Sequence, residues 1–468
     1  MRFTSACCSL LVLLISSPAL YAAELVSVTP ETYDEFVPDG KETDAIYGDY
    51  VLRNDDIVAV IADPIPSRKA NMMIRFSGGQ LIDLTTRRLR SDQLGSFYAG
   101  PVRLEYAFDS VSVDGAIQHL RDRYDVSLRG NQVGLTVTNR SAGDYPASRV
   151  TYSVADGDPY LTIETVFTND SSAPLVFSLQ DHIRMDQSGD KTAIAKAPDE
   201  VADRFWLYDP WFGQAYTIVA DGMPIAAKTG ADGRAASVLR YETGTPDGAI
   251  KLAPGESHRL VRRVIPGATL LESNTIAAKL KGSDQKWVTI RVKDSQGRAL
   301  AGAEIDVLRD ASSIGFGRTR ADGSLQFAVP AGVNLTARVS SLGSGEAEIR
   351  LAPTDADAYD VTLPAAGFVM AEYRDDRGAR VPCKIQFYGR NGTRDPFFGP
   401  DSGIYGVHNV VYTPDGRAEQ PLPPGKYDVI VSYGPEYDAI FDTIEIKQGE
   451  QTRISGELKR VVDTTRSE

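Results

Sequence analysis

The sequence predicts an all-β protein in which a large antiparallel super-sandwich is followed by two small β-sandwiches in tandem. Three observations support this prediction. Hydrophobic and polar residues alternate with a period of two along nearly the whole chain, which is typical of half-buried strands. Asp-Gly and similar turn dipeptides separate these stretches. A pattern of strand, turn and strand also occurs twice in the C-terminal part of the chain.

The size and composition fit a chain of several folded domains. It has 468 residues, of which 42% are hydrophobic and 24% charged, and this excludes a mostly disordered protein. Because one domain commonly takes about 150 residues, we expect two to four domains. The net charge of -13 repels phosphate backbones, so nucleic acid is not an expected partner.

Residues 1–23 are predicted to form an export signal. Arg2 supplies the positive charge, Leu10–Ile15 form an uncharged apolar core, and small residues offer cleavage near Ala22 or Ala23. We therefore expect a secreted or periplasmic protein, in which no later segment is apolar and long enough to cross a membrane as a helix. Cleavage leaves Cys383 alone, so no intramolecular disulfide is expected.

Residues 24–282 are predicted to form the large sandwich, because they far exceed the roughly 100 residues of an immunoglobulin-like domain. Pro30–Phe36 are the exception and predict one or two helical turns, with Thr29 as the N-cap. The strand candidates are Tyr50–Arg53, Ile57–Ala62, Met73–Phe76, Val102–Phe108, Tyr124–Leu128, Gln132–Val137, Tyr160–Thr168 and Leu175–Leu179. The expected tight turns are Asn54–Asp56, Asp114–Gly115, Gly130–Asn131 and Asp156–Gly157.

The repeat divides the remaining chain into residues 283–364 and 365–468. Val288–Leu308 and Val369–Tyr388 each predict two strands joined by a turn that begins with Asp, and further turns that contain Asp-Gly and Pro follow at matching places. On the pattern of these turns, the first copy resembles carboxypeptidase regulatory-like domains, which are prealbumin-like sandwiches. The second is a similar prealbumin-like or immunoglobulin-like sandwich with an insertion over Gly389–Val410.

The strongest polar cluster follows the apolar strand 175–179. In an extended chain, His182, Arg184 and Asp186 lie on one face and Asp181 on the other. A base, a cation and an acid on one concave face suit a sugar pocket or an acid–base site. The alternative is structural, with Arg184 and Asp186 paired at a sheet edge and His182 half exposed.

Two further stretches supply candidate ligand-binding residues. In the aromatic run 204–213, Trp211 would stack on a sugar ring while Asp209 accepts hydrogen bonds from hydroxyl groups. Alternatively, this run is an aromatic plug at one end of the core. The segment after Ala62 would present Arg68 and Asn71 on a loop, whereas its prolines alternatively mark only the end of a strand.

No motif for metal, nucleotide or nucleophilic catalysis is present in the sequence. The four histidines are far apart, so no local zinc motif exists, and neither a Gly-x-Ser-x-Gly elbow nor a phosphate-binding loop occurs. Cys383 lies in a predicted strand, where a packing role is expected. We therefore predict no cofactor, no metal site and no catalytic residue.

Several motifs near the two ends carry a resemblance to a known family. They are Tyr50–Asp55, Asp63–Ile65, Gly78–Leu84, Gly399–Gly403, Val411–Gly416, Pro421–Val429 and Gly434–Asp438. The chain thereby resembles the N-terminal, non-catalytic region of secreted CehA/McbA-type proteins, which carry a PHP metallohydrolase domain. In that family a strand with a His-x-His metal motif follows the part that resembles Leu458–Thr465, whereas this sequence ends at Glu468. We therefore expect the catalytic ligands to be absent from this chain.

The resemblance implies a secreted, non-catalytic accessory protein, equivalent to the substrate-presenting half of such a hydrolase. Its first domain would be galactose-mutarotase-like and would bind carbohydrate, and its expected partners are a sugar and a separately encoded catalytic domain. Two alternatives stay open. The first domain would be a sugar-active enzyme, mutarotase- or lyase-like, in which His182 and an acidic partner transfer protons. The chain would otherwise be a structural or adhesive spacer.

Overall fold

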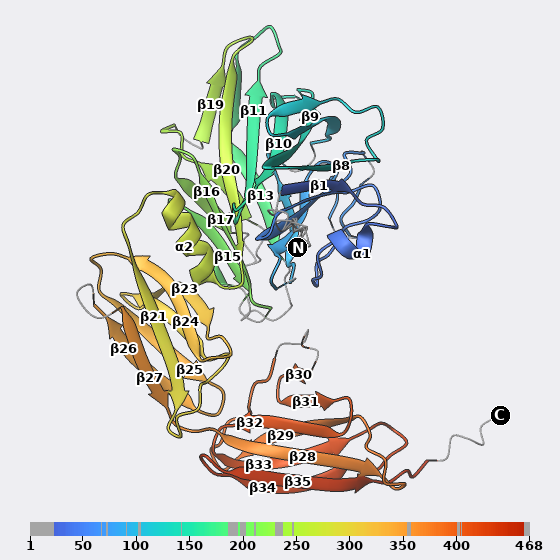
Figure 1. Cartoon of the computed structure of the whole chain (residues 1–468), viewed down its shortest axis with the longest axis vertical. Coiled ribbons are helices and arrows are strands. Elements are labelled where there is room, and N and C mark those ends of the chain that lie inside the picture. Colours follow the sequence, from blue (N-terminus) through green and yellow to red (C-terminus); the bar gives the residue numbers. More distant parts are fainter. Residues whose placement is uncertain are drawn as a thin grey trace, which may run out of the picture.

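The computed structural model describes residues 23–462, apart from residues 67, 72–73, 90, 102–103, 142, 186–194, 197–202, 210–211, 230–236, 246–247, 353–356, 400–402 and 404. All but the last residue of the predicted export signal lie outside the described residues. The fold is all-β, as the sequence predicts, and comprises one large and two small β-sandwiches that follow each other along the chain (Figure 1).

Two nine-stranded antiparallel sheets form the large sandwich. Sheet I has the order β17-β18-β13-β5-β4-β3-β2-β1-β8, and sheet II has the order β14-β15-β16-β20-β11-β10-β9-β6-β7. The strands of sheet I are β1 (Ala23–Ser27), β2 (Tyr50–Arg53), β3 (Ile57–Ile61), β4 (Leu81–Thr86), β5 (Leu94–Tyr98), β8 (Ser127–Gly130), β13 (Gln180–Met185), β17 (Ile225–Thr229) and β18 (Ser237–Tyr241). Those of sheet II are β6 (Ala107–Val113), β7 (Ala116–Gln118), β9 (Gln132–Asn139), β10 (Ala147–Ala155), β11 (Leu161–Thr168), β14 (Ala195–Lys196), β15 (Phe205–Asp209), β16 (Gln214–Ala220) and β20 (Ser257–Gly267). A separate pair is formed by β12 (Leu175–Ser178) and β19 (Ala249–Leu252).

Sheet II is buried on one face only over most of its width. On β11, Leu161, Ile163 and Phe167 are fully buried in the core between the sheets, and Thr162 and Glu164 alternate with them on the outward face. This period of two is what the sequence predicted for a half-exposed strand. The apolar side chains removed from water here supply the main stabilisation of the sandwich.

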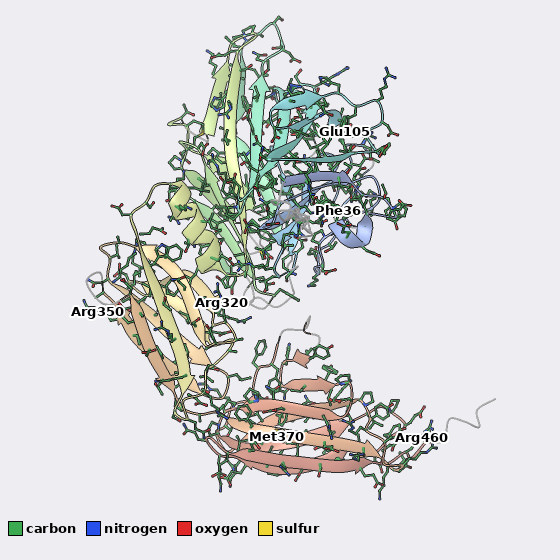
Figure 2. All side chains as sticks on the ribbon, viewed as in Figure 1. Phe36, Glu105, Arg320, Arg350, Met370 and Arg460 are labelled. Atoms are coloured by element: carbon green, nitrogen blue, oxygen red, sulfur yellow. The ribbon has the colours of Figure 1, made fainter. Side chains whose placement is uncertain are left out.

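Sheet I is buried on both faces over β2, β3 and β4, where every residue is buried. Its outward face is covered by helix α1 (Tyr33–Phe36) and by loops that contribute to a second apolar cluster. The guanidinium of Arg53 lies 3.5 Å from the ring centroid of Phe36, which Figure 2 labels on α1, and its Nε donates to Glu24 Oε2 at 2.6 Å. These contacts fix the cover to strands β1 and β2.

Helix α2 (Leu270–Leu280) connects the large sandwich to the next one. The Thr269 Oγ1 atom accepts a hydrogen bond from Glu272 N at 3.1 Å and so caps its N-terminus. Ala277 packs with Val219 and Ile265 of sheet II, whereas Leu271 belongs to the core of the second sandwich. The sequence analysis missed this helix.

The two small sandwiches share one strand-pairing pattern, which explains the sequence repeat. The central strand of one sheet pairs antiparallel with one neighbour and parallel with the other in both copies. In the second sandwich these strands are β21 (Gln285–Asp294), β24 (Ser324–Pro330) and β27 (Ala358–Leu363), and in the third they are β28 (Gly367–Asp375), β32 (Arg417–Leu422) and β35 (Gln451–Leu458). In the second sandwich the opposing sheet contains β23 (Ser312–Arg318), β22 (Glu304–Arg309), β25 (Leu335–Ser341) and β26 (Gly345–Leu351). In the third sandwich it contains β30 (Gly406–Val407), β31 (Val410–Thr413), β29 (Cys383–Arg390), β33 (Gly425–Ser432) and β34 (Ile440–Ile446).

Several local predictions were wrong. Residues 104–106 and 124–126 are not in strands, although Val102–Phe108 and Tyr124–Leu128 were predicted as strands, because β6 and β8 begin only at Ala107 and Ser127. Gly130–Asn131 is not a hairpin turn, since it links β8 of sheet I to β9 of sheet II. The described part of Met73–Phe76 is not a strand, and Phe76 has a positive φ of 59°. The N-cap of α1 is Thr32 rather than Thr29.

Candidate functional site

His182 and Arg184 lie on the outward face of β13, as the alternation predicted. Both are half-buried, and Asp181 points the other way, into the core. In the strand register, His182 lies opposite Tyr98 and Val238. Burial lowers the pKa of His182, with Arg184 acting in the same direction and Asp181 opposing it, so the neutral imidazole is favoured. Asp186 lies outside the described residues.

Asp181 forms a buried ion pair that the sequence analysis missed. Its Oδ2 accepts from Arg262 Nε at 2.7 Å and its Oδ1 from Arg262 Nη2 at 2.8 Å, and neither side chain is exposed. The Tyr241 hydroxyl donates to the same carboxylate. Burial and the charge of Asp181 raise the pKa of Tyr241. Because Arg262 belongs to sheet II, this pair joins the two sheets, and Asp181 is not available to His182 as a proton-transfer partner.

Arg68 and Asn71 are structural residues, which corrects the prediction that a loop presents them to a ligand. Arg68 is buried, and its Nε and Nη2 donate to the two oxygens of Asp49 at 3.0 and 2.6 Å. Asn71 donates to Asp44 Oδ2 at 3.2 Å and accepts from Ile74 N. The buried carboxylate of Asp49 requires such a partner when the loop folds over sheet I.

The aromatic run forms strand β15 instead of a loop. Phe205 and Leu207 are fully buried in the core, which fits the structural alternative, and Tyr208 packs against Phe316 of the second sandwich at 5.4 Å between ring centroids. Asp209 is also fully buried, and its Oδ1 accepts from Phe212 N at 3.1 Å. Trp211 lies outside the described residues. Among the predicted residues that the structure describes, Arg68 and Asp209 are buried, so they do not line an open site with His182 and Arg184.

A polar groove of about 430 Å³ lies on the outward face of sheet II, where the sequence analysis had placed no site. Strands β6, β9, β10, β11 and β20 form its floor, and the turns at residues 158–160 and 221 border it. Its lining residues are Ser112, Gly115, Gln132, Thr151, Ser153, Asp158, Tyr160, Thr162, Glu164, Asp221, Arg259, Val261 and Arg263. Its volume falls within the range of about 300–1,000 Å³ that is usual for ligand sites.

The strand register places hydroxyl groups and charges side by side in the groove. Ser153 of β10 lies opposite Thr162 of β11, which lies opposite Arg263 of β20. In the next row, Thr151 lies opposite Glu164. Because directly opposed side chains are about 5 Å apart, these rows form a continuous field of donors and acceptors.

A glycine keeps the floor of the groove open. A Cβ atom on Gly134 of β9 would lie 2.7 Å from Ser112 Oγ and 3.7 Å from Ser153 Cβ. A glycine within a strand weakens it, and it often marks a place where another group approaches the backbone.

Four of the five charged side chains that line the groove form two ion pairs, and the fifth is Asp158. Arg259 Nη2 lies 2.5 Å from Glu164 Oε2, and Arg263 pairs with Asp221. The guanidinium of Arg263 also lies 5.8 Å from the ring centroid of Tyr160. Burial and the nearby carboxylate of Asp158 raise the pKa of Tyr160, so its hydroxyl stays protonated at neutral pH. The groove therefore offers hydrogen-bond donors and acceptors together with one aromatic face, and each of its two arginines already faces a carboxylate.

The sequence signal for this groove was present but ambiguous. Thr151, Ser153, Thr162 and Glu164 are the outward members of two alternating strands. A plain solvent-exposed strand face has the same composition, so only the sheet register shows that these side chains share a hollow surface.

A larger groove of about 920 Å³ lies on the third sandwich, around Met370, which Figure 2 labels on the sheet of β28. Among its charged residues, Glu372 forms ion pairs with both Arg374 and Arg417. The described residues that line it include no aromatic side chain. A sugar would find no ring to stack on here.

Neither a metal cluster nor a membrane-spanning helix is found in the described part of the chain. No three His, Cys, Asp or Glu side chains of residues 23–462, with the gaps given above, are placed to hold a metal ion. In the same residues no helix is long and apolar enough to span a bilayer.

Comparisons with known proteins do not assign this chain to a family. No family model and no curated protein matches it. Similar solved structures include a TPR-domain containing protein from Parabacteroides distasonis, with 15% identity, coverage of 47% of each chain and a TM-score of 0.32. A galactose mutarotase-like protein from Lactobacillus casei has 12% identity, covers 47% of this chain and 100% of its own, and has a TM-score of 0.26. A putative aldose 1-epimerase from Escherichia coli K12 has 14% identity, covers 45% and 96%, and has a TM-score of 0.28.

This chain spans about half the length of the first of these structures. At these TM-scores the similarities say nothing about function.

Proposed function

We propose that this chain is a carbohydrate-binding protein and that a neutral oligosaccharide lies in the groove on sheet II. The observation that carries the proposal is the row of Ser153, Thr162 and Arg263 beside the row of Thr151 and Glu164, bordered by the ring of Tyr160. Sugar hydroxyl groups both donate and accept hydrogen bonds, and these side chains supply both kinds of partner.

The charge pattern of the groove favours a neutral ligand over an anionic one. Arg259 and Arg263 already face Glu164 and Asp221, so a further anion would have to displace a carboxylate. A sugar hydroxyl can instead join an existing ion pair without separating its charges. Each such bond contributes a net of about 0.5–1.5 kcal/mol, so useful affinity requires several contacts at once. The length of the groove over five strands permits several.

Binding is tested on a glycan array and by calorimetric titration with the neutral oligosaccharides that score highest. Thr162→Val keeps the shape of the side chain and removes its hydroxyl group, and we expect about fivefold to tenfold weaker binding. Thr168→Val is the matched control, because Thr168 lies on the same strand and face, outside the groove lining.

Two results would contradict the proposal. A folded wild-type chain that is silent on the array would favour the spacer role. Equal binding by the Thr162→Val and Thr168→Val variants would move any sugar site away from the groove.

The same proposal makes the chain an exported accessory protein that presents its sugar to a PHP-type catalytic domain. The CehA/McbA-like motifs at Tyr50–Asp55 and Gly78–Leu84 support it. Strand β1 begins at Ala23, which pairs with Gly130, so cleavage after Ala22 would leave the strand intact. Mass spectrometry of the exported protein should find an N-terminus at Ala23 or Glu24. An exported chain that retains Met1, or a chain found only in the cytoplasm, would refute this part.

A further inference from the structure

Aromatic side chains gather on the surface of the third sandwich. Tyr405 is 66% exposed, Phe441 74% and Phe397 53%, and Tyr433 and Tyr388 are more than one-third exposed. Exposed apolar surface of this kind, when it is contiguous, marks a contact site for a ligand or partner. Three of the tyrosines of this sandwich share one hollow.

This tyrosine pocket has a volume of about 320 Å³ and lies on the outer side of the sheet that contains β29 and β31. It is lined by Pro382, Cys383, Lys384, Tyr405, Tyr412, Thr413, Pro414 and Tyr433. Three rings, two prolines and the aliphatic stem of a lysine make its walls suitable for a flat ligand with an apolar face.

Strand pairing places Tyr412 in the pocket, and Tyr405 and Tyr433 lie next to the ends of two further strands. Lys384 of β29 lies opposite Tyr412 of β31 on one side and Ser432 of β33 on the other, so Tyr433 follows directly at the pocket edge. The Tyr412 backbone N–H donates to the backbone carbonyl of Tyr405 at 2.8 Å, which holds the backbone of Tyr405 beside β31. The ring of Tyr433 is supported from behind by Tyr437, at 4.6 Å between centroids. The site therefore combines strand residues of β29 and β31 with residues next to the ends of β30 and β33.

The pocket also contains a cation that faces a ring. The ammonium of Lys384 lies 5.8 Å from the ring centroid of Tyr412. Within the described residues, no carboxylate lies within ion-pair distance of this ammonium. In the groove of sheet II, by contrast, each arginine faces an acid. The two sites therefore select ligands of different charge.

We propose that the tyrosine pocket binds a hexuronate residue of an acidic oligosaccharide. The apolar face of the pyranose ring stacks on Tyr412 and Tyr433, and its carboxylate pairs with Lys384. A neutral sugar or a proline-rich peptide would also fit between the tyrosines but would gain no ion pair with Lys384. This site belongs to a different sandwich from the groove, and the proposal does not rest on the function assigned to the groove.

The test is calorimetric titration of the full chain with trigalacturonate, its methyl ester and a decaproline peptide. We expect trigalacturonate to bind about tenfold more tightly than the uncharged ester, a difference that falls as salt is added. Lys384→Gln should remove this difference while leaving ester binding in place. Tyr433→Ala should abolish binding of trigalacturonate, whereas Phe441→Ala, an exposed ring outside the pocket lining, should bind like the wild type.

The outcomes separate the two sites. If Thr162→Val leaves trigalacturonate binding unchanged, the tyrosine pocket stands whatever happens to neutral sugars. Equal binding of trigalacturonate and its ester in the wild type would overturn the uronate assignment. Preferential binding of decaproline, or wild-type behaviour of Tyr433→Ala, would overturn the saccharide assignment altogether.

Discussion

Replacing Arg262 by methionine should destabilise the large sandwich more than any surface substitution. Arg262 is fully buried on β20 and donates two hydrogen bonds to Asp181, at 2.7 and 2.8 Å, and a third to Thr165 Oγ1 at 2.7 Å. Methionine fills a similar volume but leaves the Asp181 carboxylate buried without its cation. Breaking a buried pair in this way costs about 3–5 kcal/mol.

The hydrogen bonds give a similar magnitude. A bond to a charged group contributes about 1.5–3 kcal/mol, and two of them join Arg262 to Asp181. The double variant Arg262→Met with Asp181→Leu removes both charges and should recover most of the loss, because an apolar replacement of a buried pair is often neutral. The partial recovery distinguishes an uncompensated charge from simple loss of packing.

The assay is urea unfolding of the full chain, followed by circular dichroism at pH 7, with the free energy of unfolding compared among wild type, both single variants and the double variant. A loss below about 1 kcal/mol in Arg262→Met would refute the reasoning, since that is within the effect of an ordinary substitution. A double variant no more stable than Arg262→Met would refute it as well.

Three other predictions concern single side chains. Burial and the charge of Asp92 raise the pKa of Asp83, so protonated Asp83 stabilises the fold at acid pH, and this contribution is lost as the pH rises above the pKa of Asp83 in the unfolded chain. Asp83→Asn should therefore make the free energies of unfolding in urea at pH 5 and pH 8 more alike. An unchanged difference between the two free energies would contradict this. Thr269→Ala removes the cap of α2 and should cost about 1 kcal/mol, seen as a lower melting temperature than in wild type. Burial raises the pKa of the Cys383 thiol to about 11, which lowers the fraction of reactive thiolate. Iodoacetamide at pH 8 should therefore label Cys383 about a hundredfold more slowly in the native chain than in urea. Equal labelling rates would be inconsistent with a buried thiol.

Most features that depend on residues close together in the chain, such as strands and turns, could be predicted from the sequence. The alternation on β11 and the hairpin of β2 and β3 follow from local patterning, and the structure has both. The repeat of the small sandwiches was also visible, because Asp294 and Asp375 form the same turn, each accepting from backbone N–H groups two and four residues later. Such features need no knowledge of distant contacts.

The features that could not be predicted from the sequence depend on contacts between residues far apart in the chain. Arg68 looked like a loop residue, since nothing local shows that Asp49, 19 residues earlier, holds it in a buried ion pair. Helix α2 was missed because its apolar residues are divided between two sandwiches and do not form one stripe. The groove of sheet II was missed because its Ser and Thr side chains differ from a plain strand face only in their register across sheet II.

The most direct test of the central claim is hydroxyl-radical footprinting of the full chain, with and without a saturating neutral oligosaccharide chosen from the array. Tyr160 borders the groove, and Tyr405 and Tyr433 line the separate pocket. Binding in the groove predicts that the oxidation of Tyr160 falls severalfold while Tyr405 and Tyr433 react as before. Protection of the pocket tyrosines with no change at Tyr160 would contradict the assignment of the groove as the site for neutral sugars.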